Sequence, residues 1–481
     1  MSSGTRSNRQ YKRRWYRTKN FAQWLKLRGQ GTVVSSIPLV LILFVTCLDF
    51  ITFEFALYNF NGFFSLRSVA GFEDEPARLR ADSLQKNVQA VAYIAAILLA
   101  LPHLGALIKF FTREKGFLLI ILVILLTSVV SENPVKVYTN SIHIGFGMIA
   151  AFLFAYPLRH QRDVIYKMLW VVFFSSYVVL VGSLLHWLHN FEESIELFEQ
   201  GWRYGGFVGN PNNMGWVCML ACWSGLGLAT NRELKRSLRL LAFSAALLSV
   251  LCAILADSVT TYVVLAVIAL FALWDYFITL FNKRIQKTLK VVCLFAVVIT
   301  TPVFITYLVG GSGSIIAAAS ESLTGDSTLT GRADIWEVGR AAFFERPLLG
   351  WSFDTHLTVS DSAYSIPYTQ YHNGYIDTLV GGGAVLLLVL LWQVTATIIR
   401  TLRMAGQDRL VFPVIGFLAV VFVANISEHA ILRIDNPIWQ TYVACAIAIA
   451  VIYFSNNEKS LPVRKSDKRP SVSRSKKRYR F

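Results

Sequence analysis

The sequence has few of the features that mark a soluble enzyme. Only 16% of its 481 residues are charged, whereas 54% are hydrophobic. It contains no Walker loop, no dinucleotide-binding fingerprint, no zinc motif and no internal repeat of fixed period. These absences argue against chemistry on a cytoplasmic nucleotide, and the low charge content is the profile of a polytopic membrane protein.

The sequence pattern predicts neither a disulfide framework nor a cleavable leader. Cys218 and Cys222 share a helix face, but no second ligand pair accompanies them, so a zinc site is not indicated. Nine basic residues precede the first full-length apolar run, so the start has no signal-peptide pattern and should stay attached. All six cysteines lie inside predicted spans, where disulfides are uncommon: Cys47, Cys218, Cys222, Cys252, Cys293 and Cys445.

Apolar runs near the roughly 20 residues that cross a bilayer dominate the chain. We predict an all-α polytopic membrane protein with about 12 transmembrane helices. With both termini in the cytoplasm, every short basic loop also lies there, as Lys and Arg require. The runs cover approximately 36–58, 88–111, 116–132, 139–158, 164–187, 213–230, 237–255, 260–281, 288–308, 374–400, 410–427 and 437–455.

The net charge is confined to the two ends of the chain. Residues 1–35 hold nine basic and no acidic residues, and residues 456–481 hold ten basic and two acidic ones, which accounts for the whole formal charge of +17. Basic tails beside membrane spans more often mark topology and attract anionic lipids than bind nucleic acid. We therefore predict two basic cytoplasmic tails, the second one disordered, around a transmembrane domain at residues 36–455.

The longest predicted outer loop covers about residues 310–373. A loop of that length in a compact protein is usually functional. In its centre, "LTGRADIWEVGRAAFFERPLLGW", apolar residues recur at helical spacing. This pattern predicts an amphipathic helix near the membrane from about Arg332 to Glu345, ended by Pro347.

Arginines lie on this outer side, from which basic residues are normally excluded. Arg332 and Arg340 belong to the predicted helix, and an arginine fork with free helix N–H groups makes a good anion site. Arg203 precedes the turn Asn210-Pro211-Asn212-Asn213, which starts the sixth span. Ion pairs with acidic neighbours or lipid head groups, and interfacial anchoring of Arg203, are the alternative explanations.

A histidine opens the tenth span. His372 and Asn373 are followed by Asp377 and by three consecutive glycines that end at Gly383. Residues four or five apart on a helix can meet, and a carboxylate fixes an imidazole tautomer and raises its basicity, so we predict that Asp377 orients His372. A purely structural hydrogen bond is the alternative for the histidine. The glycines permit close approach of a helix or a lipid chain.

Two further clusters of polar residues are weaker candidates for a functional site. Asp49 and Glu54 lie in the outer half of the first span, where they could pair with an outer arginine or line a groove. Glu428, His429 and Arg433 form a charged outer turn in "SEHAILRID". We favour a structural salt-bridge cluster for this turn.

Three of these segments together resemble a known family. "GRADIW" fits an Arg-x-x-x-Leu type motif with Trp336 in place of the usual leucine, and His372 to Gly383 fits a His-x10-Gly motif. "RYGGFVGNPNN" is similar to an Arg plus Gly-Asn-Pro-Asn segment. In this order, over roughly residues 36–455, they resemble the O-antigen ligase and Wzy-type polymerase superfamily.

This sequence departs from the family pattern at one place. Many members carry a Ser-Arg pair before the eighth span, whereas here Val259 follows Ser258. Arg340 or Arg433 could replace the missing cation.

The resemblance implies a GT-C-like glycosyltransferase in the bacterial cytoplasmic membrane with an outward-facing site. Such an enzyme passes a glycan en bloc from an undecaprenyl diphosphate carrier to an acceptor hydroxyl, on the lipid A core in ligases and on another carrier-linked unit in polymerases. No metal or cofactor is implied, and direct displacement inverts the anomeric centre. We predict that His372 is the general base and that Arg332 and Arg203 bind the diphosphate. The further predicted substrate contacts are Arg340, His356, Asp377, Asn373, Asn210, Asn212 and Gly383.

A transporter or flippase of lipid-linked sugars is the competing class of function. Transporters usually carry intramembrane charges near the midplane and have two inverted halves. In this chain the polar candidates gather at the outer face, and the two halves differ in spacing. The pattern therefore favours an enzyme.

Overall fold

A computed structural model describes ten stretches of the chain and a few isolated positions between residues 281 and 289. The stretches are residues 30–47, 75–161, 163–189, 195–198, 201–231, 233–278, 332–353, 371–404, 412–433 and 436–460. Nearly all of the described residues are helical, and they include one antiparallel hairpin in which Glu196 faces Arg203 in the strand register. The two predicted tails lie outside the described residues, apart from the first residues of α3 and the last residues of α19.

Most of the described helices overlap a predicted apolar run, although α3 and α5 begin before theirs. Their bounds are α3 Gln30–Thr46, α5 Glu75–Ala100, α6 Leu104–Arg113, α7 Lys115–Leu126, α8 Pro134–Leu158, α9 Val164–His189, β1 Ile195–Phe198, β2 Gly201–Tyr204, α10 Pro211–Ala229, α11 Arg236–Ala256, α12 Val259–Ile278, α15 Arg332–Glu345, α17 Gly374–Met404, α18 Phe417–Ser427 and α19 Pro437–Ser460. The predicted bounds of the amphipathic helix agree with those of α15.

Six helical segments in the described part of the chain are long and apolar enough to cross a membrane. They are Asn87–Arg113, Pro134–Leu158, Val164–His189, Arg236–Ala256, Gly374–Met404 and Pro437–Asn457, and four shorter apolar helices accompany them. These findings confirm an all-α membrane protein. A total of twelve spans and a GT-C-like fold remain predictions, and the run 288–308 lies almost wholly outside the described residues.

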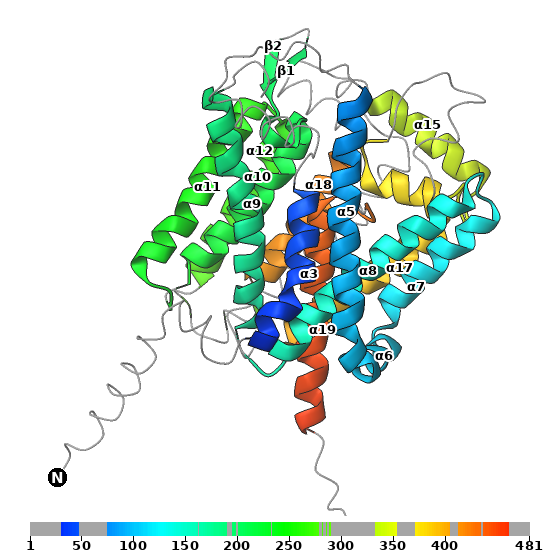
Figure 1. The fold of residues 1–481 in the computed structure, drawn as a ribbon, viewed down its shortest axis with the longest axis horizontal. Helices are drawn as coiled ribbons and strands as arrows, with labels where there is room; N and C mark the ends of the chain where they lie inside the picture. Colours follow the sequence, from blue (N-terminus) through cyan, green and yellow to red (C-terminus); the bar gives the residue numbers. More distant parts are fainter. Residues whose placement is uncertain are drawn as a thin grey trace, which may run out of the picture.

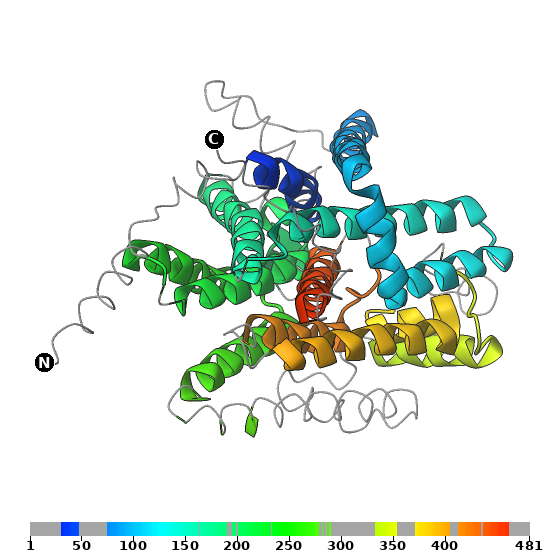
Figure 2. The same cartoon turned by 90° about the horizontal axis from the view of Figure 1, so that it is seen from below.

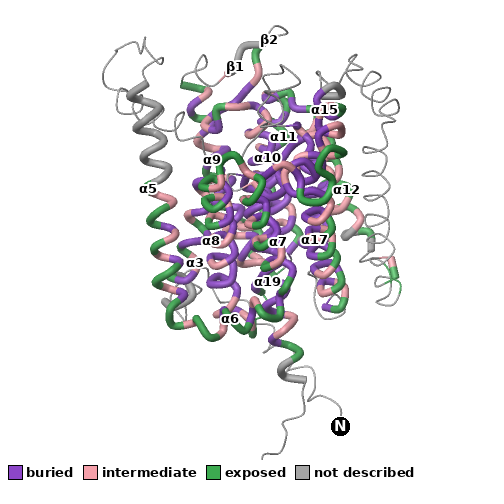
Figure 3. Tube along the Cα trace, turned by 90° about the vertical axis from the view of Figure 1, so that its right-hand side faces the viewer, coloured by how far each residue is buried: buried purple, intermediate pink, exposed green. Residues whose placement is uncertain are grey.

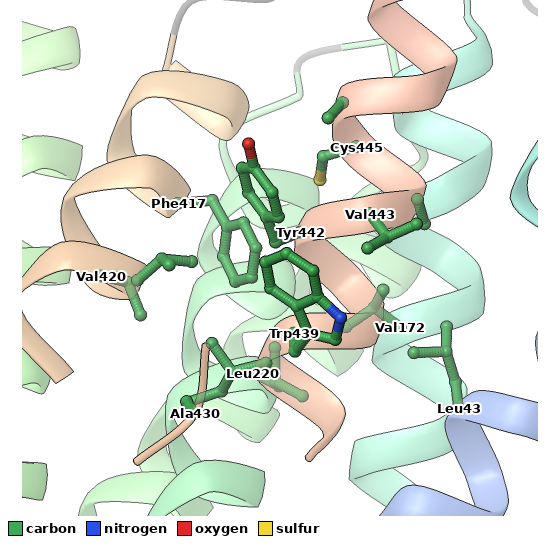
Figure 4. Packing of buried hydrophobic residues seen from close by; sticks show 14 of the residues in the cluster. Leu43, Val172, Leu220, Phe417, Val420, Ala430, Trp439, Tyr442, Val443 and Cys445 are labelled. Atoms are coloured by element: carbon green, nitrogen blue, oxygen red, sulfur yellow. The ribbon is translucent and has the colours of Figure 1, made fainter. Parts of the chain in front are cut away.

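The helices pack around α19. This helix occupies the centre of the bundle (Figure 2), and 89% of its most apolar stretch is buried. Its Trp439 and Tyr442 rings stack with centroids 5.2 Å apart beside Phe417 of α18 (Figure 4). The peripheral α5 is exposed along much of its apolar length (Figure 3), as a bilayer solvent allows.

The hairpin β1–β2 and α15 lie at one end of the bundle, and α6 lies at the other (Figure 1). Near α6, the buried carboxylate of Glu114 pairs with Arg400 from the last turns of α17. The Arg400 guanidinium also lies over the Phe454 ring of α19, 5.3 Å from its centroid. This end of α17 is therefore fixed by a buried ion pair.

The helical ladder of α17 is interrupted at Gly383, which has φ 67° and ψ −174°. The segment that follows α15 fills this break: Pro347 O accepts from Ala384 N–H at 2.8 Å, and Leu348 O accepts from Val385 N–H at 3.3 Å. A Cβ on Gly383 would lie 2.1 Å from Leu348 O. The group that approaches this glycine is therefore a loop backbone, whereas the sequence suggested a helix or a lipid chain.

Candidate functional site

His372 lies just before α17, within reach of a buried carboxylate. Its Nδ1 is 3.8 Å from Glu428 Oε2, and the exposed fractions of the two side chains are 25% and 3%. Glu428 follows the end of α18, and its backbone carbonyl accepts from Gly374 N–H at 3.0 Å. The first turn of α17 and the end of α18 are thereby held together at this imidazole.

Asp377 pairs with a different histidine from the one predicted. Its Oδ2 lies 3.4 Å from Nδ1 of His429, and its Oδ1 accepts from Tyr371 N–H at 3.4 Å. The hypothesis that Asp377 orients the His372 imidazole is wrong in this structure, because His372 precedes the helix and helical spacing does not apply to it. Asp377 instead holds the backbone immediately before His372.

Two asparagines shape the backbone on either side of these pairs. Asn373 caps α17, since its Oδ1 accepts from the N–H groups of Tyr375 and Ile376, and its Nδ2 donates to Ile426 O at 2.9 Å. Asn425 Oδ1 accepts from two N–H groups of the turn after α18, each at 2.8 Å. The Asn373 side chain, predicted to touch substrate, is buried in these backbone contacts.

Three described residues other than glycine have positive φ angles, one between α11 and α12 and two near the ends of α17 and α18. They are Asp257 at 45°, His372 at 50° and Leu432 at 62°. Such conformations are uncommon outside glycine and tend to cluster at functional sites. The strain at Leu432 is notable because a bulky side chain disfavours this region more than histidine or aspartate does.

Arg203 of β2 is held against the corner between α11 and α12. Its Nε donates to Ala256 O at 3.0 Å, and its Nη2 donates to Asn212 Oδ1 at 3.4 Å. Asn210 caps α10, since its Oδ1 accepts from the N–H groups of Asn212 and Asn213. The predicted segment around Arg203 therefore folds as one unit.

The turn between α11 and α12, against which Arg203 is held (the Arg203 corner), contacts the end of α18 next to the partner of His372. In the first turn of α12, Thr260 Oγ1 is hydrogen-bonded to Ser427 Oγ at 2.7 Å. Ser427 is the last residue of α18 and precedes Glu428, the partner of His372. Arg203 and His372 thus lie at the same end of the bundle.

Helix α15 packs against the start of α17. Trp336 Nε1 donates to Tyr371 O at 3.0 Å, and a Cβ on Gly339 would lie 2.4 Å from Ile376. Arg340 Nη2 lies 3.5 Å from the exposed Glu337 Oε1, as the ion-pair alternative expected. Arg332 begins this helix, but its side chain and the whole of His356 lie outside the described residues.

Tyr371 is the phenol closest in sequence to His372. Burial, with a smaller contribution from the Asp377 charge, raises the pKa of its hydroxyl above the ordinary tyrosine value. The phenol therefore stays protonated at neutral pH and is not suited to act as a base. His372 is the better candidate for accepting a proton in this cluster.

Sequence reasoning predicted a structural salt-bridge cluster at Glu428 and His429, and the structure shows which residues they pair with. Both were treated as members of a structural cluster, yet each contacts a residue at the start of α17. The available signal was the adjacency of a carboxylate and an imidazole in a predicted outer turn. That signal does not reveal the partners, because the contacts span more than 50 residues of sequence.

Residues 244–391 match the family model described as O-antigen ligase. The matched stretch runs from α11 into α17, and it includes α15 and His372 but not Arg203 or Glu428. A search of curated proteins finds no match.

Proposed function

We propose, from the match of residues 244–391 to the O-antigen ligase family model, that this chain is a membrane glycosyltransferase of that superfamily. It transfers an oligosaccharide or polysaccharide en bloc from undecaprenyl diphosphate to an acceptor hydroxyl on the outer face of the cytoplasmic membrane. The observation that supports this proposal is the convergence of three distant segments: Trp336 contacts Tyr371 beside His372, and the Arg203 corner connects through Thr260 and Ser427.

Arginines bind the donor diphosphate in this proposal. The Arg203 guanidinium is already oriented by the Ala256 carbonyl and the Asn212 side chain, so little ordering is needed when an anion arrives. Arg332 supplies a second cation from the first turn of α15, and Arg340 is a weaker contributor from the same helix. A planar fork on phosphate oxygens stabilises the charge that grows on the leaving group.

His372 acts as general base toward the acceptor. A carboxylate beside Nδ1 favours the tautomer with its proton on Nδ1, which leaves the Nε2 lone pair for the acceptor. The acceptor O–H gives its proton to Nε2 while its oxygen bonds to the anomeric carbon. The bond from that carbon to the diphosphate breaks, and its electron pair leaves with the diphosphate, so the anomeric centre is inverted.

The acceptor is either the lipid A core or a growing surface polysaccharide. In both cases the active site faces outward, both termini lie in the cytoplasm, and the two basic tails contact anionic lipids. No metal or cofactor takes part in the proposed transfer.

The direct experiment incubates the purified full chain with a carrier-linked oligosaccharide and each acceptor class. We expect a new glycosidic product, detected by mass spectrometry, with lipid A core or with a second carrier-linked unit. Movement of the donor across a liposome membrane without a new glycosidic bond would contradict the proposal and favour a flippase.

A further inference from the structure

Trp336 stands where the motif usually has leucine, and it makes a contact that leucine cannot make. Its side chain is buried between α15 and α17. Its indole Nε1 donates to the Tyr371 carbonyl at 3.0 Å. Leucine could fill the apolar space but has no donor, so the carbonyl next to His372 would lose its partner.

The residues on both sides of His372 are held by several contacts. Tyr371 donates its N–H to Asp377 and accepts from Trp336, while Asn373 is tied to Ile426 O and to the first turn of α17. His372 has φ 50° between them. A non-glycine residue stays in this conformation only where the surrounding structure imposes it.

We propose that Trp336 is a positioning residue for His372. It acts through the Tyr371 carbonyl, which fixes the peptide that leads into His372 and thereby the direction of the imidazole relative to Glu428. The same hydrogen bond sets α15, with its two arginines, in register with the base. This inference rests on the proposed function, because it assumes that His372 is the base.

Trp351 provides a matched control in the same part of the molecule. Its Nε1 also donates to a backbone carbonyl, that of Ala342, at 2.9 Å. This hydrogen bond also ties a loop to α15, but its acceptor is not next to His372. Loss of either indole N–H removes one hydrogen bond of the same kind, and only one of the two lies beside the proposed base.

The test compares Trp336→Phe with Trp351→Phe in the full chain. Both variants are expected to insert and to lose a similar, small amount of thermal stability. We expect kcat for glycan transfer to fall about 10- to 100-fold in Trp336→Phe, with little change in the donor KM, because the base is displaced. Trp351→Phe should retain a kcat near that of the wild-type protein.

A second replacement keeps the shape of the side chain. Incorporation of benzothienylalanine at position 336 substitutes sulfur for the indole N–H in an otherwise similar ring. This variant tests the role of the Trp336 N–H even if Trp336→Phe does not fold. A drop in kcat with this residue supports the inference. A wild-type kcat, or equal losses after changes at positions 336 and 351, overturns it. Absence of transfer by the wild-type protein instead refutes the proposed function.

Discussion

Replacing Gly383 by alanine tests the contact between α17 and the segment that follows α15. The new Cβ would lie 2.1 Å from Leu348 O and 2.6 Å from Leu349 N, both of them backbone atoms that cannot rotate away. The φ and ψ angles of Gly383 also belong to a region that is almost exclusive to glycine. The loop must therefore move or the helix must be remade.

The expected loss in the free energy of unfolding of Gly383→Ala has two parts. Backbone strain at such a position amounts to about 1–3 kcal/mol. Displacing the loop also breaks the hydrogen bonds from Ala384 to Pro347 and from Val385 to Leu348, at about 1 kcal/mol each. The sum is a loss of about 3–5 kcal/mol in the free energy of unfolding.

Thermal unfolding of the detergent-solubilised full chain measures this loss. The control is Gly105→Ala in α6, where no atom lies within 4 Å of the added Cβ and alanine is the better helix former by about 1 kcal/mol. We expect Gly383→Ala to unfold at a clearly lower temperature and Gly105→Ala at or above the wild-type temperature. If Gly383→Ala unfolds like the wild-type protein, the reasoning from the loop contact is refuted.

Three other substitutions test the proposed site. His372→Ala should lower transfer by about 100-fold or more while size-exclusion behaviour stays normal, because the base is lost; near-normal activity would remove the base assignment. Arg203→Lys should raise the donor KM in a donor titration, since lysine keeps the charge but loses the fork that holds Ala256 O. Asn425→Ala should lower the unfolding free energy by about 2–4 kcal/mol in a denaturant titration, because two buried N–H groups lose their acceptor; a change below about 1 kcal/mol would contradict this role.

The helices could be predicted from the sequence because each buries or exposes a continuous apolar surface. The bounds of α15 agreed with its apolar spacing and with Pro347, which cannot continue a helix. The reason for the glycine triplet was not predictable, because the backbone that crosses Gly383 belongs to a loop more than 30 residues earlier. Periodicity describes a single element and contains no information on which segment packs against it.

At the candidate site, too, the sequence pattern did not reveal which distant segments are in contact. His372 was predicted as the functional imidazole, but its partner was inferred from helical spacing that begins only at Gly374. Glu428 and His429 reach α17 through tertiary packing and the Asn425 turn. Motif order suggested that the Arg203 segment and His372 belong to one site, and only the fold reveals the hydroxyl contact between Thr260 and Ser427 that connects their surroundings.

The interruption of α17 has a mechanical consequence. The ladder of backbone hydrogen bonds is broken at Gly383, so the nine residues from Gly374 to Gly382 need not move as one rod with the rest of the helix. The longer remainder of α17 is fixed near its C-terminal end by the ion pair between its own Arg400 and Glu114. The position of this short segment therefore depends on α15 and on the end of α18, through the hydrogen bonds from Trp336 to Tyr371 and from Gly374 to Glu428, rather than on the rest of α17.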